Sequence, residues 1–512
     1  MAQLLLQLSR IDHLWHYIKL HGVSCLLLGV LLTLLYNRYA SPLRKFPGPL
    51  LASSTRLWQV WTAWTGKAEE HYIAVHRQYG PIVRLGPNEI SMASPLAALD
   101  IFKTGKGFYK SDFYTIFLPP NVKDLFTEIR EPVHAVMKRF AVPPYSLASV
   151  QQHTEDIEAL LWKFQSKMDD FAVHDNLAVE LGSWLHYLAF DVLGQFAFAH
   201  PFGFLDAGTD MDGFCKTIRR SGWESGIVGH VPFVEKLTRS NPIWKYVPFL
   251  PENAVSLLPR TAELMLKRHL EEDDHAAGTG PKSLLKAHLE SHNEYPDKFS
   301  IRDVISLSTG AVAAGSDSTA STMQSFVWHV LSNSKIHDKL VAEILRSPLS
   351  EMVQYKEAQA LEYFQACLKE TMRLQPALGA NITRMVPGEG TEVNGTWLPG
   401  GTQVALNAWV LHRDKDIFGT DADLFNPERW LSKDENCVKM MERCMFQFGG
   451  GSHLCIGRHL ALFEMNKLLP QLFRRYEMTL VSQKPLDHIT GLFYLQSGLC
   501  VYLRRRRGEV HV

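Results

Sequence analysis

The chain has 512 residues, 46% of them hydrophobic, which suits a globular protein with a large buried core. Its 53 lysines and arginines balance its 53 aspartates and glutamates, so nothing argues for nucleic acid as a partner. The seven cysteines are odd in number and scattered, so they show no disulfide framework and favour a reducing compartment.

The first predicted element is an apolar helix at residues 21–37, close to the lower length of a membrane-spanning helix. A cleaved signal peptide or a buried core helix would give a similar run. Arg38, Arg44 and Lys45 follow it, and positive charges after an apolar span favour a cytosolic position for that side. The prediction is a retained transmembrane anchor, with residues 1–20 as a short lumenal segment and the rest of the chain in the cytosol.

Residues 38–50 are predicted to form a hinge, because the Phe-Pro-Gly-Pro sequence within them cannot continue a helix. Residues 51–512 then form a single domain without repeats. Two strands are expected around a Gly-Pro-Asn turn at residues 82–93, helical patterns dominate residues 95–376, and short strands return after residue 391. This order predicts a mainly α fold with small peripheral β-sheets.

A long helix is predicted around residues 303–330, where small residues recur every four positions and end at Ala314 and Ser318. Such a face lets a helix lie close over a planar cofactor. Asp317, with the hydroxyl groups of Ser318 and Thr319 beside it, could hand protons to bound oxygen through water. Tight packing between helices, with the hydroxyl groups bonded back to helical carbonyls, explains the same pattern, and the sequence leaves both readings open.

Two further features carry little information alone. Glu370 and Arg373 are three residues apart on a predicted helix and can form an ion pair, but an exposed pair contributes only about 0–1 kcal/mol and is common. Arg429 lies further along in an Asn-Pro-Glu-Arg-Trp segment. Neither feature indicates a function until it is combined with the C-terminal segment.

The most informative segment lies near the C-terminus, where three glycines precede Cys455 and Gly457 follows it. Glycines allow the backbone to turn tightly and to approach a flat ligand. A lone thiolate on such a loop is a strong ligand for haem iron. The alternative is a glycine loop that holds an ordinary buried cysteine, and a glycine motif alone does not exclude it.

This segment resembles the haem-binding loop of the cytochrome P450 monooxygenases, because Phe448, Gly451, Cys455 and Gly457 match the family signature. His453 stands where the family has an arginine that contacts a haem propionate, and a histidine is shorter and only partly charged near neutral pH. The resemblance implies that haem is retained, with Cys455 as its thiolate ligand and with Phe448 and His453 in the cofactor site.

The acid–alcohol helix of the family is matched by Ala314, Gly315, Asp317 and Thr319, with Ser318 in place of the usual threonine. The resemblance implies that Asp317, Ser318 and Thr319 are catalytic. Serine keeps the hydroxyl group but lacks the methyl group that fixes its rotamer. Activity is therefore expected to survive, with more uncoupled reduction of oxygen.

The resemblance also gives a role to the charged residues. Glu370, Arg373 and Arg429 match the family's Glu-x-x-Arg and Pro-Glu-Arg motifs, which implies a buried network that supports the haem loop from behind. The resemblance also implies that basic side chains bind the haem propionates, and the three candidates are His134, Lys138 and Arg384. An ordinary basic helix face is the alternative for the segment that holds the first two.

Residues 184–191 and 412–414 resemble filamentous-fungal members of the pisatin-demethylase-like kind. The implied function is a membrane-anchored haem-thiolate monooxygenase of the endoplasmic reticulum that inserts one oxygen atom of O₂ into a lipophilic small molecule in secondary-metabolite biosynthesis. Electrons would come from NADPH through a separate NADPH–cytochrome P450 reductase. By analogy, residues 113–120, 377–382 and 492–494 form pocket walls.

Two alternatives remain at this point. One is a haem-thiolate isomerase or dehydratase, which needs no external O₂, and the retention of Asp317 and Ser318 argues against it. The other is a catalytically silent haem-binding or sterol-binding membrane protein, and only the replacements at His453 and Ser318 support it.

Overall fold

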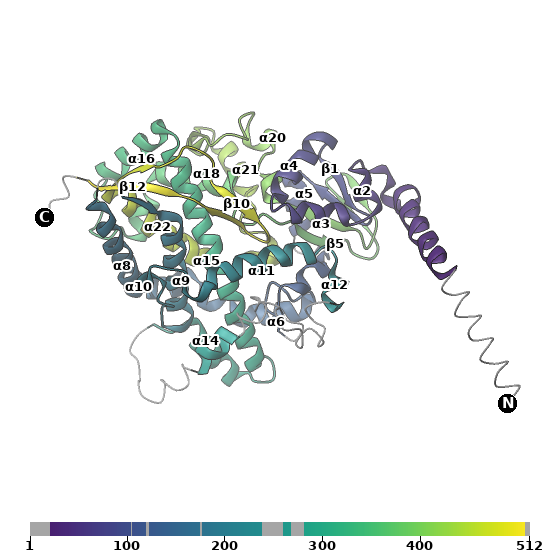
Figure 1. Ribbon diagram of the computed structural model, residues 1–512, viewed down its shortest axis with the longest axis horizontal. Coiled ribbons are helices and arrows are strands. Elements are labelled where there is room, and N and C mark those ends of the chain that lie inside the picture. The colour runs from purple at the N-terminus through teal and green to yellow at the C-terminus, as the bar shows by residue number, and fades with distance from the viewer. Residues whose placement is uncertain are drawn as a thin grey trace, which may run out of the picture.

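The computed structural model describes residues 21–103, 105–118, 122–174, 177–237, 260–267 and 281–506. The predicted lumenal segment, residues 1–20, lies outside these ranges. Within them, helices dominate and the strands form four small sheets (Figure 1). The mainly α fold with small sheets, predicted from the sequence, is confirmed.

The N-terminal helix, His21–Ala40, projects from the rest of the molecule (Figure 1). It is the one helix among the described residues that is long and apolar enough to cross a membrane, and none of its apolar stretch is buried. Its last turn, η1 (Tyr36–Ala40), is a π-helix, and the 3₁₀-helix η2 (Pro42–Lys45) follows. The hinge then passes so close to the next strand that a Cβ at Gly48 would lie 2.3 Å from the Arg84 carbonyl oxygen.

The largest sheet has five strands in the order β1-β2-β8-β5-β3. Only the β2–β8 pair is parallel within this sheet. The hairpin predicted at residues 82–93 is confirmed as β1 and β2. The strands are β1 (Ile82–Gly86), β2 (Glu89–Met92), β3 (Tyr109–Lys110), β5 (Ile382–Met385) and β8 (Gln403–Leu406).

Three smaller sheets lie elsewhere in the described chain. Their strands are β4 (Ala178–Glu180), β12 (Cys500–Arg505) and β9 (Tyr476–Leu480) in the first, β10 (Asp487–Thr490) and β11 (Tyr494–Ser497) in the second, and β6 (Thr391–Val393) and β7 (Thr396–Leu398) in the third. β11 runs beside the long central helix, because the Ser321 hydroxyl donates to the Tyr494 carbonyl at 2.5 Å.

The helices that frame the site belong to the larger, helical part of the molecule. They are α6 (Glu131–Ala141), α8 (Thr154–Ala172), α9 (Leu181–Phe198), α11 (Phe214–Val228), α14 (Leu284–Glu294), α15 (Ile301–Leu331), α16 (Ser334–Arg346), α18 (Glu362–Leu374) and α22 (Arg458–Arg475). Near the hinge lie α2 (Leu50–Ser54), α3 (Leu57–Trp64), α4 (Ala68–Tyr79) and α5 (Pro95–Phe102).

Helix α15 crosses the whole domain and begins at a capping box. The Ser300 hydroxyl accepts from the Asp303 N–H at 3.3 Å, and the Asp303 carboxylate accepts from the Ser300 N–H at 2.7 Å. These bonds satisfy two N–H groups that a helix start leaves open. The helix predicted around residues 303–330 is thus confirmed, with slightly wider bounds.

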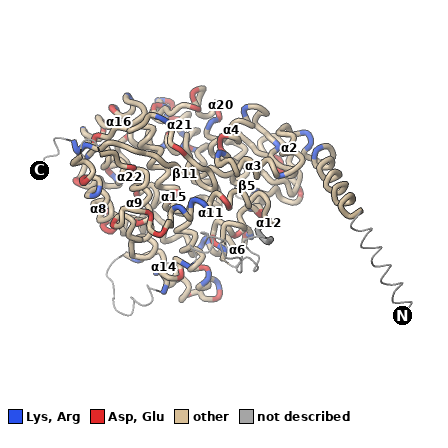
Figure 2. The backbone as a smooth tube through the Cα atoms, in the orientation of Figure 1, with Lys and Arg blue, Asp and Glu red and all other residues tan. Residues whose placement is uncertain are grey.

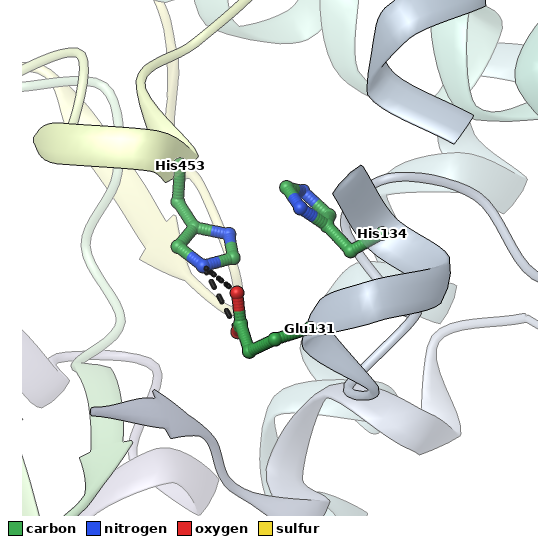
Figure 3. Close-up of side chains that lie close together, drawn as sticks. All are labelled: Glu131, His134 and His453. Carbon is green, nitrogen blue, oxygen red and sulfur yellow. Dashed lines mark hydrogen bonds and ion pairs between the residues drawn. The ribbon is translucent and has the colours of Figure 1, made fainter. Parts of the chain in front are cut away.

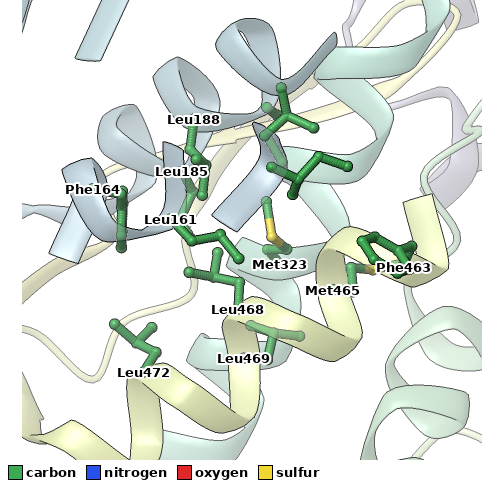
Figure 4. Packing of buried hydrophobic residues seen from close by; sticks show 14 of the residues in the cluster. Leu161, Phe164, Leu185, Leu188, Met323, Phe463, Met465, Leu468, Leu469 and Leu472 are labelled. Atoms are coloured by element: carbon green, nitrogen blue, oxygen red, sulfur yellow. The ribbon is translucent and has the colours of Figure 1, made fainter. Parts of the chain in front are cut away.

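The main core lies where α8, α9, α15 and α22 meet (Figure 4). Leu161, Phe164, Leu185, Met323 and Leu468 are each 3% exposed or less. Helix α9 is mostly apolar, and most of its residues are buried. This rigid core fixes α15 against α22, and the candidate site lies along these two helices.

Candidate active site

A cavity of about 400 Å³ lies between α11, α15, the loop before α22 and the β10–β11 hairpin. Cys455 lines this cavity, and so do Asp317 and Ser318 on α15. All three predicted pocket walls contribute to it, with Tyr114, Phe117, Ala377, Ile382, Leu492 and Phe493 among the lining residues. Residues 119–120 of the first wall lie outside the described chain.

The loop that carries Cys455 turns tightly through its glycines. Gly449 and Gly451 have φ angles of 74° and 60°, which L side chains rarely adopt. A Cβ at Gly451 would lie 2.1 Å from the carbonyl oxygen of Phe102, and one at Gly450 would lie 2.7 Å from the Phe102 ring. The tight turn was predicted from the glycines. The sequence analysis expected their close approach to be to a flat ligand, but the atoms that exclude side chains at Gly450 and Gly451 belong to Phe102 of α5.

Cys455 is exposed toward the cavity that it lines, while the other sides of the thiol are packed against protein. Its N–H donates to the Phe448 carbonyl at 2.9 Å, which fixes its backbone. Burial raises the pKa of the thiol, while the N–H groups of Gly457 and Arg458 and the charge of Arg458 oppose this rise. The start of α22 therefore offers donors to a sulfur that becomes negative when it binds a metal ion.

Five basic side chains gather at one end of the cavity: Lys110, His134, Lys138, Arg384 and His453. Lys138 donates to the Ser452 carbonyl at 2.5 Å and so links α6 to the cysteine loop. Arg384 donates to the Tyr114 hydroxyl at 2.9 Å. The rings of His134 and His453 lie 4.4 Å apart. The structure thus brings together all four basic residues that the sequence suggested, and it adds Lys110.

His453, expected to be partly charged near neutral pH, contacts a carboxylate within the protein. Its Nε2–H donates to the Glu131 carboxylate at 3.1 and 3.2 Å, and Glu131 was not predicted (Figure 3). Burial, followed by the charges of Arg384 and Lys110, lowers the pKa of His453 to about 2. The ring is therefore neutral in this arrangement, and its Nδ1 is buried without a hydrogen-bond partner.

This end of the cavity fits the two propionates of a haem. Burial and neighbouring positive charges lower the pKa of His134 to about 4 and that of Lys110 to about 8. Basic groups that depress one another in this way would be stabilised by added negative charge. The unpartnered Nδ1 of His453 also has no acceptor or donor from the described protein. The depressed pKa values of these basic groups favour an anionic group at this end, whereas Nδ1 of the neutral His453 ring is a hydrogen-bond acceptor.

On α15, the acid and the hydroxyl groups point to different partners. The Asp317 carboxylate accepts from His186 Nε2 of α9 at 3.1 Å, and both residues are buried. The Ser318 hydroxyl donates to the Ala314 carbonyl and the Thr319 hydroxyl to the Gly315 carbonyl, each at 2.8 Å. The hydroxyl groups are thus bonded back to the helix, as one of the two sequence readings described, while all three residues line the cavity.

Sequence reasoning missed several of these partners. His186 lies in a segment chosen only for its resemblance, and no spacing rule links it to Asp317. Asp124 also lines the cavity, and it fills the space beside Gly310, where a Cβ would lie 2.1 Å from its carboxylate. The first small residue of the α15 face therefore makes room for Asp124. Close approach to a cofactor is therefore not needed to explain the glycine at position 310.

The predicted Glu370 network is buried and continuous. Arg373 donates to both carboxylate oxygens of Glu370 at 2.8 Å, and Arg429 donates to the same carboxylate at 3.1 Å. Trp430 Nε1 donates to it at 3.0 Å. Glu370 and Arg373 are both 0% exposed. These four side-chain N–H donors come from two segments, α18 and residues 429–430, and the Asn426 N–H donates to the same buried carboxylate at 2.8 Å.

This network reaches the cysteine loop through one histidine. Arg373 Nη1 donates to the His412 carbonyl at 2.7 Å. His412 Nε2 in turn accepts from the N–H of Phe446, which begins the loop, also at 2.7 Å. Burial lowers the pKa of His412 to about 3, so the ring stays neutral and can accept this bond. The predicted support from behind therefore has a direct path, through a histidine that the sequence analysis noted only for its resemblance to fungal members.

Comparison with known proteins gives one consistent family. The family model described as Cytochrome P450 matches residues 48–499. Cytochrome P450 monooxygenase cicH of Emericella nidulans is 31% identical, over 91% of this chain and 94% of that protein. A cytochrome P450 monooxygenase of Aspergillus flavus is 30% identical, over 95% and 96%. Pisatin demethylase of Fusarium vanettenii is 29% identical, over 88% and 86%.

Proposed function

The chain belongs to the cytochrome P450 family and is a haem-thiolate monooxygenase, and on this premise we propose that Cys455 is the axial ligand of the haem iron. The observation that carries this assignment is that, among the described residues, no other cysteine lines the cavity. When bound, haem supplies the activation of O₂, from which one oxygen atom enters the substrate and the other leaves as water.

The basic end of the cavity holds the haem propionates in this proposal. Lys138 and Arg384 supply fixed positive charge, and His134 and His453 supply ring nitrogens at the same end. Glu131 keeps the His453 ring in place through Nε2 and leaves the lone pair of Nδ1 open to a hydrogen-bond donor, so the charge that binds the propionates comes from the cationic side chains. Phe448 packs beside the ligand loop, and its carbonyl fixes the Cys455 backbone.

Proton delivery is assigned to Asp317 and Ser318, with Thr319 beside them. Gln324 Nε2 donates to His186 Nδ1 at 3.2 Å, so the proton of His186 lies on Nε2, where it is donated to Asp317. His186 therefore holds the carboxylate on the α9 side of α15. Because the Ser318 hydroxyl uses its hydrogen on Ala314, its oxygen accepts a hydrogen bond from water in the cavity and orients that water.

A monooxygenase of this family uses O₂, a small-molecule substrate and electrons from a redox partner. The finer assignment is a separate NADPH–cytochrome P450 reductase and a lipophilic substrate of fungal secondary metabolism, which the fungal sources of the relatives support. The single-pass anchor at residues 21–37 in the endoplasmic reticulum membrane, with the domain in the cytosol, is supported by the exposed apolar helix and by the basic residues at its body end (Figure 2).

The carbon-monoxide difference spectrum tests the ligand assignment. Cys455→Ala is expected to abolish the red-shifted Soret band of the reduced carbon-monoxide complex, because that band requires a thiolate on iron. Cys437→Ala, at an exposed position, is the matched control and should keep the band. Persistence of the band in Cys455→Ala would show that another group binds the iron.

A further inference from the structure

Arg219 is a basic side chain that lines the cavity from α11. Its Nη2 donates to the Gln496 carbonyl of β11 at 3.0 Å. This bond uses one of the five N–H donors of a guanidinium group. Among the described residues, no carboxylate lies within ion-pair distance of Arg219. The cavity thus contains a guanidinium group held in place but not neutralised.

The next residue on the helix shows the contrast. Arg220 is exposed, and its Nε donates to the Glu224 carboxylate at 2.7 Å in an i,i+4 pair. An exposed cation has water as an alternative partner, so such a pair contributes little. The half-buried Arg219 would gain more from a counter-charge, yet no described carboxylate lies within 4.0 Å of it.

Arg219 is separate from the basic end that suits the haem propionates. The main positive charges that lower the pKa of His134 are Lys110, Lys138 and Arg384, and the same three charges and His134 lower that of His453. Arg219 is not among these main contributors. Arg219 instead influences Cys215, one turn earlier on α11, where it opposes the rise in the pKa of that thiol. The haem propionates therefore have partners without Arg219.

The cavity-lining neighbours of Arg219 on its own helix and on the hairpin are apolar or uncharged. Ile218 and Trp223 of α11 line the cavity beside it, as do Phe493 and Leu495 of the hairpin. An apolar wall with one convergent charged group is the usual form of a site for a small amphipathic molecule. A guanidinium group binds a carboxylate through two parallel N–H donors, which gives orientation as well as affinity.

We propose that Arg219 binds a carboxylate of the substrate, so that this monooxygenase acts on lipophilic carboxylic acids. The proposal rests on the monooxygenase function and names the substrate class of the same cavity. The carboxylate lies at the α11–β11 side against Arg219, and the apolar body of the molecule fills the space toward α15.

Equilibrium binding to the haem-loaded protein tests this, with two pairs of probes: dodecanoic acid and its methyl ester, and naphthoic acid and its methyl ester. Two readouts are used, the Soret shift and the quenching of tryptophan fluorescence, because Trp223 lines the cavity. At least one acid is expected to bind about ten- to a hundredfold more tightly than its own ester, as for a hydrogen-bonded charged group. The fluorescence readout does not depend on the iron ligand, so a failure of the Cys455 assignment is distinguishable.

Variants separate recognition of the acid from a purely structural role. Arg219→Gln keeps an N–H donor for the Gln496 carbonyl but loses the charge, and it should remove the preference for the acid while the ester binds as before. Arg220→Gln is the matched control and should keep the preference. Equal binding of acid and ester by the unaltered protein, no binding of either acid, or an unchanged preference in Arg219→Gln would each overturn the proposal.

Discussion

The Ser318 hydroxyl lines the cavity and has one acceptor function left for water. Its hydroxyl donates to the Ala314 carbonyl, which leaves only the oxygen lone pairs for water. Ser318→Ala removes that acceptor, so we expect a several-fold larger share of NADPH electrons to leave as hydrogen peroxide, with the carbon-monoxide spectrum unchanged. Peroxide release and NADPH consumption in a reductase-supplemented reaction measure this share.

Two comparisons sharpen that expectation. Ser318→Thr keeps the hydroxyl and adds the methyl group that restricts its rotamer, so it should lower peroxide release below that of the unaltered protein. His186→Leu should raise it, because the Asp317 carboxylate then loses the donor that holds it. Unaltered coupling in Ser318→Ala would remove this serine from the proton path.

Glu464 is expected to make the free energy of unfolding depend on pH. Burial raises the pKa of its carboxyl group to about 8, and Oε1 has no hydrogen-bond partner. Below the ordinary carboxyl pKa the group is protonated in both the folded and unfolded states. As the pH rises toward 8, only the unfolded state loses the proton, so the free energy of unfolding falls, by several kcal/mol at an order-of-magnitude level.

Glu464→Gln keeps the shape of the side chain and cannot ionise. Its free energy of unfolding should exceed that of the unaltered protein by more at pH 8 than at pH 5, as measured by denaturant titration of both proteins at the two values. The same difference at both pH values would show that Glu464 is not held protonated.

At the scale of elements, the Glu370 network joins three segments. Glu370→Ala leaves the buried Arg373 without its carboxylate, and we expect a loss of about 3–5 kcal/mol in the free energy of unfolding. The cysteine loop should weaken with it, because Arg373 holds His412 and His412 holds Phe446. Denaturant titration measures the first effect, and loss of haem on gel filtration measures the second.

The exposed pair of Lys339 and Glu428 is the matched control. Lys339 Nζ lies 2.7 Å from Glu428 Oε1, and both side chains are about half exposed. Lys339→Ala should change the free energy of unfolding by less than about 1 kcal/mol. A loss in Glu370→Ala no larger than this would mean that the network does not carry the loop.

The same network shows which parts of an element the sequence can predict. Glu370 and Arg373 lie one turn apart on α18, so their pairing follows from helical spacing. Trp430 and His412 complete the network from segments that meet α18 only after folding. Local periodicity likewise predicted α15 and the β1–β2 hairpin. It could not predict that Glu131 of α6 reaches His453.

For the whole molecule, the order of the motifs along the chain predicted the fold, because each motif matched a local pattern. The cavity walls were predicted only by analogy, since α5, α11 and the β10–β11 hairpin come together through tertiary packing. The same holds for Asp317: its spacing from Ser318 is readable in the sequence, but its direction toward His186 depends on how α9 crosses α15. The identity of the candidate site residues could therefore be read from the sequence, whereas their geometry depends on tertiary packing.

The hinge end of the molecule suggests two separate membrane contacts. Besides the N-terminal helix, α2 and α3 expose Leu50, Leu57 and Trp61, which are 70%, 58% and 49% exposed. A cluster of exposed apolar side chains next to an anchor is suited to the membrane interface. The body itself should then retain some affinity for lipid when the anchor is removed.

Removal of residues 1–35 tests this, and it preserves Asn37, whose amide donates to the Ser54 carbonyl at 3.0 Å and whose carbonyl accepts from Arg84 at 2.8 Å. The truncated protein should keep its carbon-monoxide spectrum and still sediment partly with lipid vesicles, even at about 1 M salt, where surface charge attraction is screened. Adding Leu50→Ser, Leu57→Ser and Trp61→Ser should leave the spectrum unchanged and release the protein. Full release by truncation alone would show that the anchor is the only contact, because apolar burial, unlike charge attraction, does not weaken in salt.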